Sequence, residues 1–180
     1  MNKKLQIVVY FLVMLYPLGL DLYLVASPEI SDFLCANEKE SGRIFSIYLI
    51  GVAISLIMSG KCLDIYGSKY VCVLGCLVYF LASLYCAGIS EGELIKFLFA
   101  RFFQGFGSGA CYITALFLIR KNNLTRDLRI KSYSRLNGVS CTVPVVAPTL
   151  GALLVLKGWP LIFLFTSFLA GVLSTLSYCL

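Results

Sequence analysis

Residues 94–119 read LIKFLFARFFQGFGSGACYITALFLI, an almost wholly apolar stretch that carries only two charges, Lys96 and Arg101. A hydrocarbon core about 30 Å thick requires roughly 20 helical residues to cross it. A segment inside a bilayer must also satisfy its backbone hydrogen bonds internally, which at this length and composition a helix does. The stretch therefore predicts one membrane-spanning helix.

Most of the remaining chain consists of five further stretches of the same character: 5–26, 44–59, 70–89, 136–156 and 159–179. Apolar types make up 59% of the 180 residues and charged types 13%, whereas an average soluble domain is about 25% charged. We therefore expect an all-α, polytopic membrane protein in which six transmembrane helices form a single bundle over residues 1–180.

The charged residues between the stretches alternate in sign along the chain. Bases precede the first stretch and fill two alternate connections: Lys3, Lys4, Lys61, Lys69, Arg120, Lys121, Arg126, Arg129, Lys131 and Arg135. The other connections are mainly acidic, with Glu29, Asp32, Glu38, Glu40, Glu91 and Glu93. The positive-inside rule predicts that both termini and the connections near 60–70 and 120–135 are cytoplasmic. This placement accounts for the net charge of +6 without a nucleic-acid partner.

The residue types that most catalytic and metal sites require are missing or scattered. The chain has no histidine, which excludes Ser-His-Asp and Cys-His catalysis and His-ligated metal sites within it. Its eight cysteines form no Cys-x-x-Cys pair, and all but Cys35 lie in or beside predicted spans. We expect no enzyme, no bound metal and no cofactor.

Two charges interrupt the apolar spans at similar depth. Asp21 lies about five residues from the outer end of its span and Arg101 about seven, so both lie roughly 8–10 Å below the outer boundary. A charge inside a bilayer costs at least about 2.5–3.5 kcal/mol on insertion scales, so such residues normally face a cavity or a partner. We expect both side chains to line one polar cavity in which Asp21 gains and loses a proton. The alternative is that each side chain extends to the nearby interface.

Small residues and prolines mark two of the spans. Gly105 and Gly109 lie four residues apart on one helix face and permit close approach of another helix. Pro144 and Pro148, followed by Gly151, each favour a bend or a loosened turn in the fifth span, because each proline removes one helical hydrogen bond.

The connection between the second and third spans, GKCLDIYGSK at residues 60–69, predicts a tight turn with a carboxylate and a base. Asp64 is expected to cap the following turn or helix and to interact with a helix N-terminus.

Four short patterns occur in order along the chain. The first is Asp21, Tyr23, Leu24, Ala26 and Pro28; the second is Gly60, Asp64, Gly67 and Lys69; the third is Arg101, Gln104, Gly105 and Gly107; the fourth is Ala147, Pro148, Gly151 and Ala152. Together they resemble signatures of the N-terminal six-helix half of a major facilitator superfamily transporter, of the Bcr/CflA-like drug/proton antiporter branch. Departures are Val25 at a family proline, Ile65 and Ser68 at family arginines, and Ala147 at a family glycine.

The resemblance implies a proton-coupled exporter of small lipophilic compounds in a bacterial inner membrane. Asp21, Arg101 and Gln104 would couple protons to substrate, and Gly60, Asp64, Gly67 and Lys69 would shape a cytoplasmic gate. Tyr16, Tyr23, Tyr48 and Tyr112 are either substrate contacts or packing and interface residues.

The family's second six-helix half is absent from these 180 residues. We therefore expect a fragment of a longer product or a half-length protein that pairs with a second half-transporter chain. Two other functions stay open: transport of a specific metabolite or siderophore, and a truncated half-protein that does not transport. The partners expected are lipid, protons and a small-molecule substrate whose identity the sequence does not specify.

Overall fold

A computed structural model describes the backbone of residues 3–123 and 125–179. Over these residues the chain forms six helices and no strand: α1 Lys3–Phe33, α2 Glu38–Tyr66, α3 Ser68–Ala87, α4 Leu94–Asn122, α5 Arg126–Val155 and α6 Pro160–Cys179. Each helix contains an apolar window long enough to cross a bilayer. The all-α, six-helix class predicted from the sequence is confirmed.

Helix α2 differs most from its predicted span of 44–59. It begins at Glu38 because Asn37 and Glu40 form a capping box, in which the Asn37 side chain accepts from the Glu40 N–H at 3.0 Å and the Glu40 carboxylate accepts from the Asn37 N–H at 2.9 Å. A membrane helix can continue into water beyond the bilayer. Charged residues therefore mark the end of the apolar span, but the helix itself extends past them.

The turn predicted over residues 60–69 is much shorter in the structure. Residues 60–66 continue α2, α3 begins at Ser68, and the junction is Gly67 alone. Its φ of +83° is in the region that glycine adopts without a steric penalty. Asp64 is consequently a helical residue, and no side chain caps the start of α3, so the capping role expected for Asp64 is wrong.

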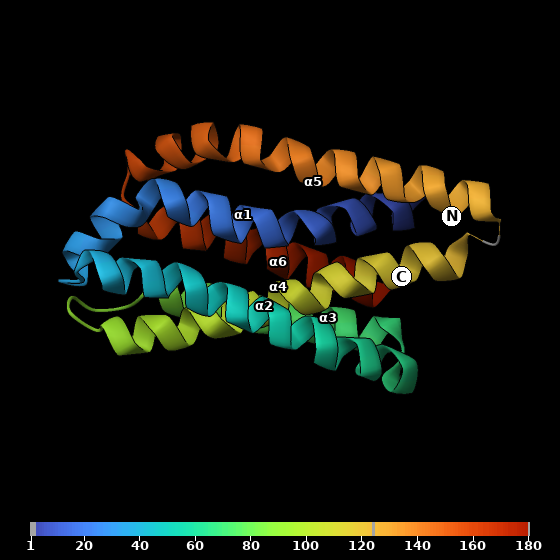
Figure 1. Cartoon of the computed structure of the whole chain (residues 1–180), viewed down its shortest axis with the longest axis horizontal. Coiled ribbons are helices and arrows are strands. Elements are labelled where there is room, and N and C mark those ends of the chain that lie inside the picture. The colour runs from blue at the N-terminus through green and yellow to red at the C-terminus, as the bar shows by residue number, and fades with distance from the viewer. Residues whose placement is uncertain (1–2, 124, 180) are drawn as a thin grey trace.

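The bundle is layered around α4 (Figure 1). The most extensive helix contacts join α2 with α4 and α3 with α4, followed by α3 with α6 and α1 with α5. Figure 1 shows α5 along one edge of the bundle, with α2, α3 and α4 overlapping toward the opposite edge and both termini toward the same end. Helix α5 packs mainly against α1 and has only minor contacts with α4 and α6.

The alternating direction of the helices divides the charges between two ends of the bundle. The basic end comprises the start of α1 and residues 60–70 and 120–135, and it holds ten of the 15 lysines and arginines but only two of the nine acids. The acidic end comprises residues 29–43, 90–96 and 156–158. Two clusters of buried apolar residues fill the interior, one toward each end.

Candidate functional site

Glycines bring the backbone of α4 directly against α2. A Cβ at Gly105 would lie 2.1 Å from the Tyr48 carbonyl oxygen, and one at Gly109 would lie 2.9 Å from the Val52 carbonyl oxygen. The approach is mutual, because a Cβ at Gly51 would lie 2.2 Å from the Phe102 carbonyl oxygen. Only glycine permits this helix pair to pack so closely.

The opposite face of α4 approaches α3 in the same way. A Cβ at Gly107 would lie 2.6 Å from the Tyr79 backbone nitrogen and 2.7 Å from the Gly75 carbonyl oxygen. Helix α4 is thus held by backbone contacts on two sides, which fixes the position of the polar side chains it carries.

Arg101 is the most prominent of these side chains, because its exposed fraction is 0%. Its Nη1 donates to the Gly19 carbonyl oxygen at 3.1 Å and to Gln104 Oε1 at 2.5 Å. The guanidinium carbon lies 4.5 Å from the ring centroids of both Tyr23 and Tyr48, within the range of cation–π attraction. Helices α1, α2 and α4 therefore share one buried cation.

A second layer of hydrogen bonds supports this arrangement. Gln104 Nε2 donates to Ser83 Oγ at 2.8 Å, which ties the site to α3. The Tyr48 hydroxyl donates to the Tyr16 carbonyl oxygen at 2.9 Å and lies 3.0 Å from Ser108 Oγ. The Arg101 site thus belongs to a polar network inside an otherwise apolar bundle.

The network leaves several polar atoms without a partner. In the described part of the chain, Arg101 Nε and Nη2 and Asp21 Oδ2 are shielded from solvent and make no hydrogen bond. Lone buried donors on a cation are costly, so they mark a place where a further acceptor would be stabilised.

Asp21 and Arg101 lie at similar depth but are not in contact. The Gly19 oxygen that Arg101 binds is only two residues, or about 3 Å of helix rise, from Asp21. Two residues also rotate a helix by roughly 200°. Gly19 faces the core, where a Cβ would meet the hydroxyls of Tyr48 and Tyr79 at 2.7 Å, so Asp21 lies on the other side of α1, one turn from exposed Leu24.

No ion pair joins Asp21 to Arg101 among residues 3–123 and 125–179. The structure therefore shows no direct bond between the two charges that the sequence analysis placed in one cavity. Arg101 is packed within the bundle, and Asp21 is partly exposed on its surface.

The four residues assigned to a gate lie at the basic end but do not form one cluster. Gly60 and Asp64 line a hollow of about 360 Å³ with Arg120 and Tyr133, between α2, α4 and α5. Lys69 lies elsewhere, in the first turn of α3, with its Nζ 4.9 Å from the ring centroid of Tyr178.

The prolines of α5 lie inside a continuous helix. Pro144 and Pro148 are both exposed, whereas Gly151 faces α1, where a Cβ would lie 3.2 Å from that of Val25. Neither proline can donate a backbone hydrogen bond, so two carbonyl groups of α5 lose their usual helical partners.

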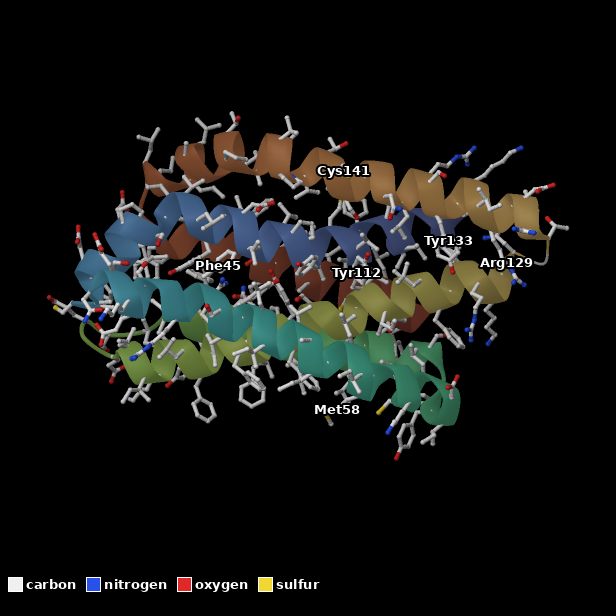
Figure 2. All side chains as sticks on the ribbon, in the orientation of Figure 1. Phe45, Met58, Tyr112, Arg129, Tyr133 and Cys141 are labelled. Carbon is white, nitrogen blue, oxygen red and sulfur yellow. The ribbon has the colours of Figure 1, made fainter. Side chains whose placement is uncertain are left out.

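Sequence reasoning did not single out Gly19, Ser83 or Phe163 as parts of the arginine site. Their contacts with Arg101 or Gln104 come from helices far apart in sequence, and no spacing rule connects them. Among the tyrosines, Tyr23 and Tyr48 are buried packing residues around Arg101. Tyr16 and Tyr112 are partly exposed, their ring centroids 6.0 Å apart, and Figure 2 shows Tyr112 near the middle of the bundle.

Comparisons with known proteins agree with this architecture. The multidrug resistance protein MdtL of Salmonella typhimurium is 42% identical over 176 residues, and that of Salmonella paratyphi A is 41% identical over the same length. Each match covers 97% of this chain and 44% of the relative, so the chain spans less than half the length of these relatives.

The fold is also that of a solved transporter. The proton:xylose symporter XylE matches with a TM-score of 0.86 at 14% sequence identity, over 98% of this chain and 44% of that one. The family model described as Major Facilitator Superfamily matches residues 9–180. The chain, a multi-pass bundle of six helices, therefore belongs to the major facilitator superfamily of membrane transporters.

Proposed function

We propose that the chain is one half of a proton-coupled exporter of small lipophilic compounds, and that Asp21 carries the coupling proton. The observation that carries this proposal is a pair of charged side chains, at similar depth on α1 and α4, whose polar atoms lack hydrogen-bond partners. Asp21 presents an oxygen with no partner, and Arg101 holds two N–H groups with none, among the residues described. A charge that stays unpaired at membrane depth is expensive and marks a functional site.

Protonation would change the balance between these two groups. Deprotonated Asp21 is drawn toward the buried guanidinium, whereas the neutral acid has no such attraction. A lipophilic cation that reaches the surface of α1 would compete with the proton for the same carboxylate. Export driven by proton entry follows when only one of the two occupies Asp21 at a time.

A pair of partly exposed aromatic rings supports a path for a lipophilic compound. Tyr16 of α1 and Tyr112 of α4 lie against each other, and aromatic rings suit flat lipophilic compounds. We propose that a second six-helix unit covers this surface and completes the path, since the MdtL relatives are more than twice as long as the matched region.

We also propose that the basic end is cytoplasmic and that the protein lies in a bacterial inner membrane. The excess of bases at one end supports this orientation by the positive-inside rule. Asp64, Gly60 and Gly67 would then act in a cytoplasmic gate with Lys69, and Pro148 and Gly151 would set the bend of α5. In intact cells, an impermeant thiol reagent should label a single-cysteine variant at Cys35 but not one at position 126; the reverse pattern contradicts the orientation.

The function is tested in a chimera that joins this chain to the second half of an MdtL relative. The chimera and its Asp21→Asn variant are expressed in cells that lack their own exporters and reconstituted in vesicles. We expect a lipophilic cation to trigger proton movement with the unaltered chimera and not with Asp21→Asn, because an amide keeps the shape of the side chain but cannot exchange the proton.

Asp32→Asn is the matched control, since it removes a carboxylate from the same helix at the acidic end. It should leave transport intact. Normal substrate-triggered proton flux in Asp21→Asn would remove Asp21 from the mechanism. Flux triggered by a metabolite or siderophore and not by lipophilic cations would favour the specific-transporter alternative.

A further inference from the structure

A cavity of about 230 Å³ opens at the basic end, where the starts of α1 and α3 meet the ends of α4 and α6. Its polar lining comes from Lys69, Lys121, Ser68, Asn122 and Ser177, and its apolar lining includes Leu5 and Val8. This cavity lies apart from the Arg101 network and from the hollow beside Asp64.

The electrostatics of this cavity are unbalanced. Its lining contains two lysines and no carboxylate, and neither lysine belongs to a salt bridge over the described residues. An anion placed here would be attracted by both lysines at once.

The start of α3 adds a second reason for an anion. Helix N-termini carry partial positive charge and exposed N–H groups, which acidic or capping side chains normally compensate. Helix α3 has no acidic residue in its first turn and no side-chain cap, and it carries Lys69 there instead. The cation–π contact between Lys69 and the Tyr178 ring holds that ammonium beside the cavity.

The depth of the cavity matches the phosphate level of a bilayer. Helix α3 has 20 residues, which corresponds to about 30 Å and to the hydrocarbon thickness. In a bilayer that α3 crosses from end to end, its first residue, Ser68, would lie where acyl chains end and phosphates begin. The apolar part of the lining continues from this polar mouth and suits the first carbons of an acyl chain.

We propose that this cavity binds the phosphate of an anionic phospholipid, with Lys69 and Lys121 on the phosphate oxygens and the N-terminus of α3 as a further donor. Basic pockets between membrane helices are known to take such headgroups. The lipid would link α1, α3, α4 and α6 at one end of the bundle. The proposal requires neither transport nor a second half, so its test is independent of the proposed function.

The experiment measures lipid binding to the purified 180-residue chain in a mild detergent by native mass spectrometry. The probes are phosphatidylglycerol, phosphatidylcholine and inorganic phosphate. We expect phosphatidylglycerol to bind most tightly, and the double variant Lys69→Gln/Lys121→Gln to weaken its binding by about thirtyfold. Replacement of both lysines by arginine should restore binding.

The matched control is Lys61→Gln/Arg126→Gln, which removes the same charge from exposed positions at the basic end outside this cavity. It should bind phosphatidylglycerol as the unaltered chain does. Ser68→Asp is a second variant, because an acid in the first turn favours the helix while it repels an anion from the cavity. It should fold and lose the lipid.

Three results would overturn the proposal. An equal loss of phosphatidylglycerol binding in the control variant would show only a general attraction of the lipid to positive charge. Equal binding of phosphatidylcholine would show an acyl-chain groove without headgroup recognition. Displacement of the lipid by millimolar inorganic phosphate would assign the cavity to free phosphate.

Discussion

Helices α4 and α5 have nearly the same length, 29 and 30 residues, yet the bundle holds them very differently. The most apolar 18-residue window of α4 is 56% buried inside the bundle, and that of α5 only 17%. Helix α4 meets two neighbours through glycines at backbone distance, whereas α5 rests mainly on α1 (Figure 1). Membrane insertion requires only apolar length, but a fixed position requires complementary small residues on both partners.

The residues of the proposed mechanism are divided between these two helices. The Arg101 network is built on the helix that the bundle holds most tightly, and the prolines lie on the helix that it holds least. The printed contacts of Arg101 come from α1, α2, α4 and α6, so a shift of α5 would leave the arginine site intact, which suits a transporter.

The largest expected effect is at Gly105. A Gly105→Ala substitution places its Cβ 2.1 Å from the Tyr48 carbonyl oxygen, so α2 and α4 must separate along their whole contact. We expect destabilisation at the upper end of the range for overpacked cores, about 3 kcal/mol or more. Unfolding of the purified chain in mixed detergent measures this loss.

Gly138→Ala on α5 is the control for that substitution. No atom lies within 4 Å of a Cβ at this position, so alanine should stabilise the helix by up to about 1 kcal/mol. Similar losses at both positions would contradict the difference between α4 and α5.

The next effect is at Arg101, where Arg101→Ala removes two hydrogen bonds and three cation–π contacts and leaves a void. We expect a loss of roughly 2–5 kcal/mol, in the range for large-to-alanine changes in a core. Asp21→Asn should change the free energy of unfolding far less, because Asp21 is partly exposed and paired with no residue described. Equal losses in the same unfolding experiment would contradict the contrast between a packed Arg101 and a partly exposed Asp21.

A smaller effect distinguishes the hydroxyl groups of two tyrosines. Tyr48→Phe removes a buried donor to the Tyr16 carbonyl oxygen and should cost about 1 kcal/mol. Tyr133→Phe removes a longer bond of 3.3 Å from α5 to the Leu116 carbonyl oxygen, in a less buried position, and should cost clearly less. The reverse order would show that α5 is held more firmly than its burial indicates.

The smallest effect is at the acidic end of α4. A hydrogen bond from Lys96 holds the pKa of Glu93 below its usual value of 4.5. The stabilisation from this exposed pair is present above that value and is lost as pH falls through the lowered pKa. In Lys96→Gln, carboxyl NMR should show the Glu93 pKa higher than in the unaltered chain, with Lys39→Gln as the unaffected control.

The sequence by itself determined the class of the protein and the place of the helices. Six apolar stretches of bilayer length leave a helix as the way to satisfy the backbone within each, and their signatures resembled the family to which the chain belongs. It also indicated that Gly105 and Gly109 share one helix face, because a helix repeats every 3.6 residues. These inferences depend on local composition and period alone.

Only the tertiary structure decided which residues meet. It placed Arg101 between Tyr23 and Tyr48, paired Gln104 with Ser83 and left Asp21 without an ion pair to the buried guanidinium. Equal depth could be estimated by counting residues along each span, but the direction of a side chain depends on how each helix is rotated. The rotation of α4 is set by its glycine contacts with α2 and α3, which join residues 28 to 57 positions apart and leave no local pattern in the sequence.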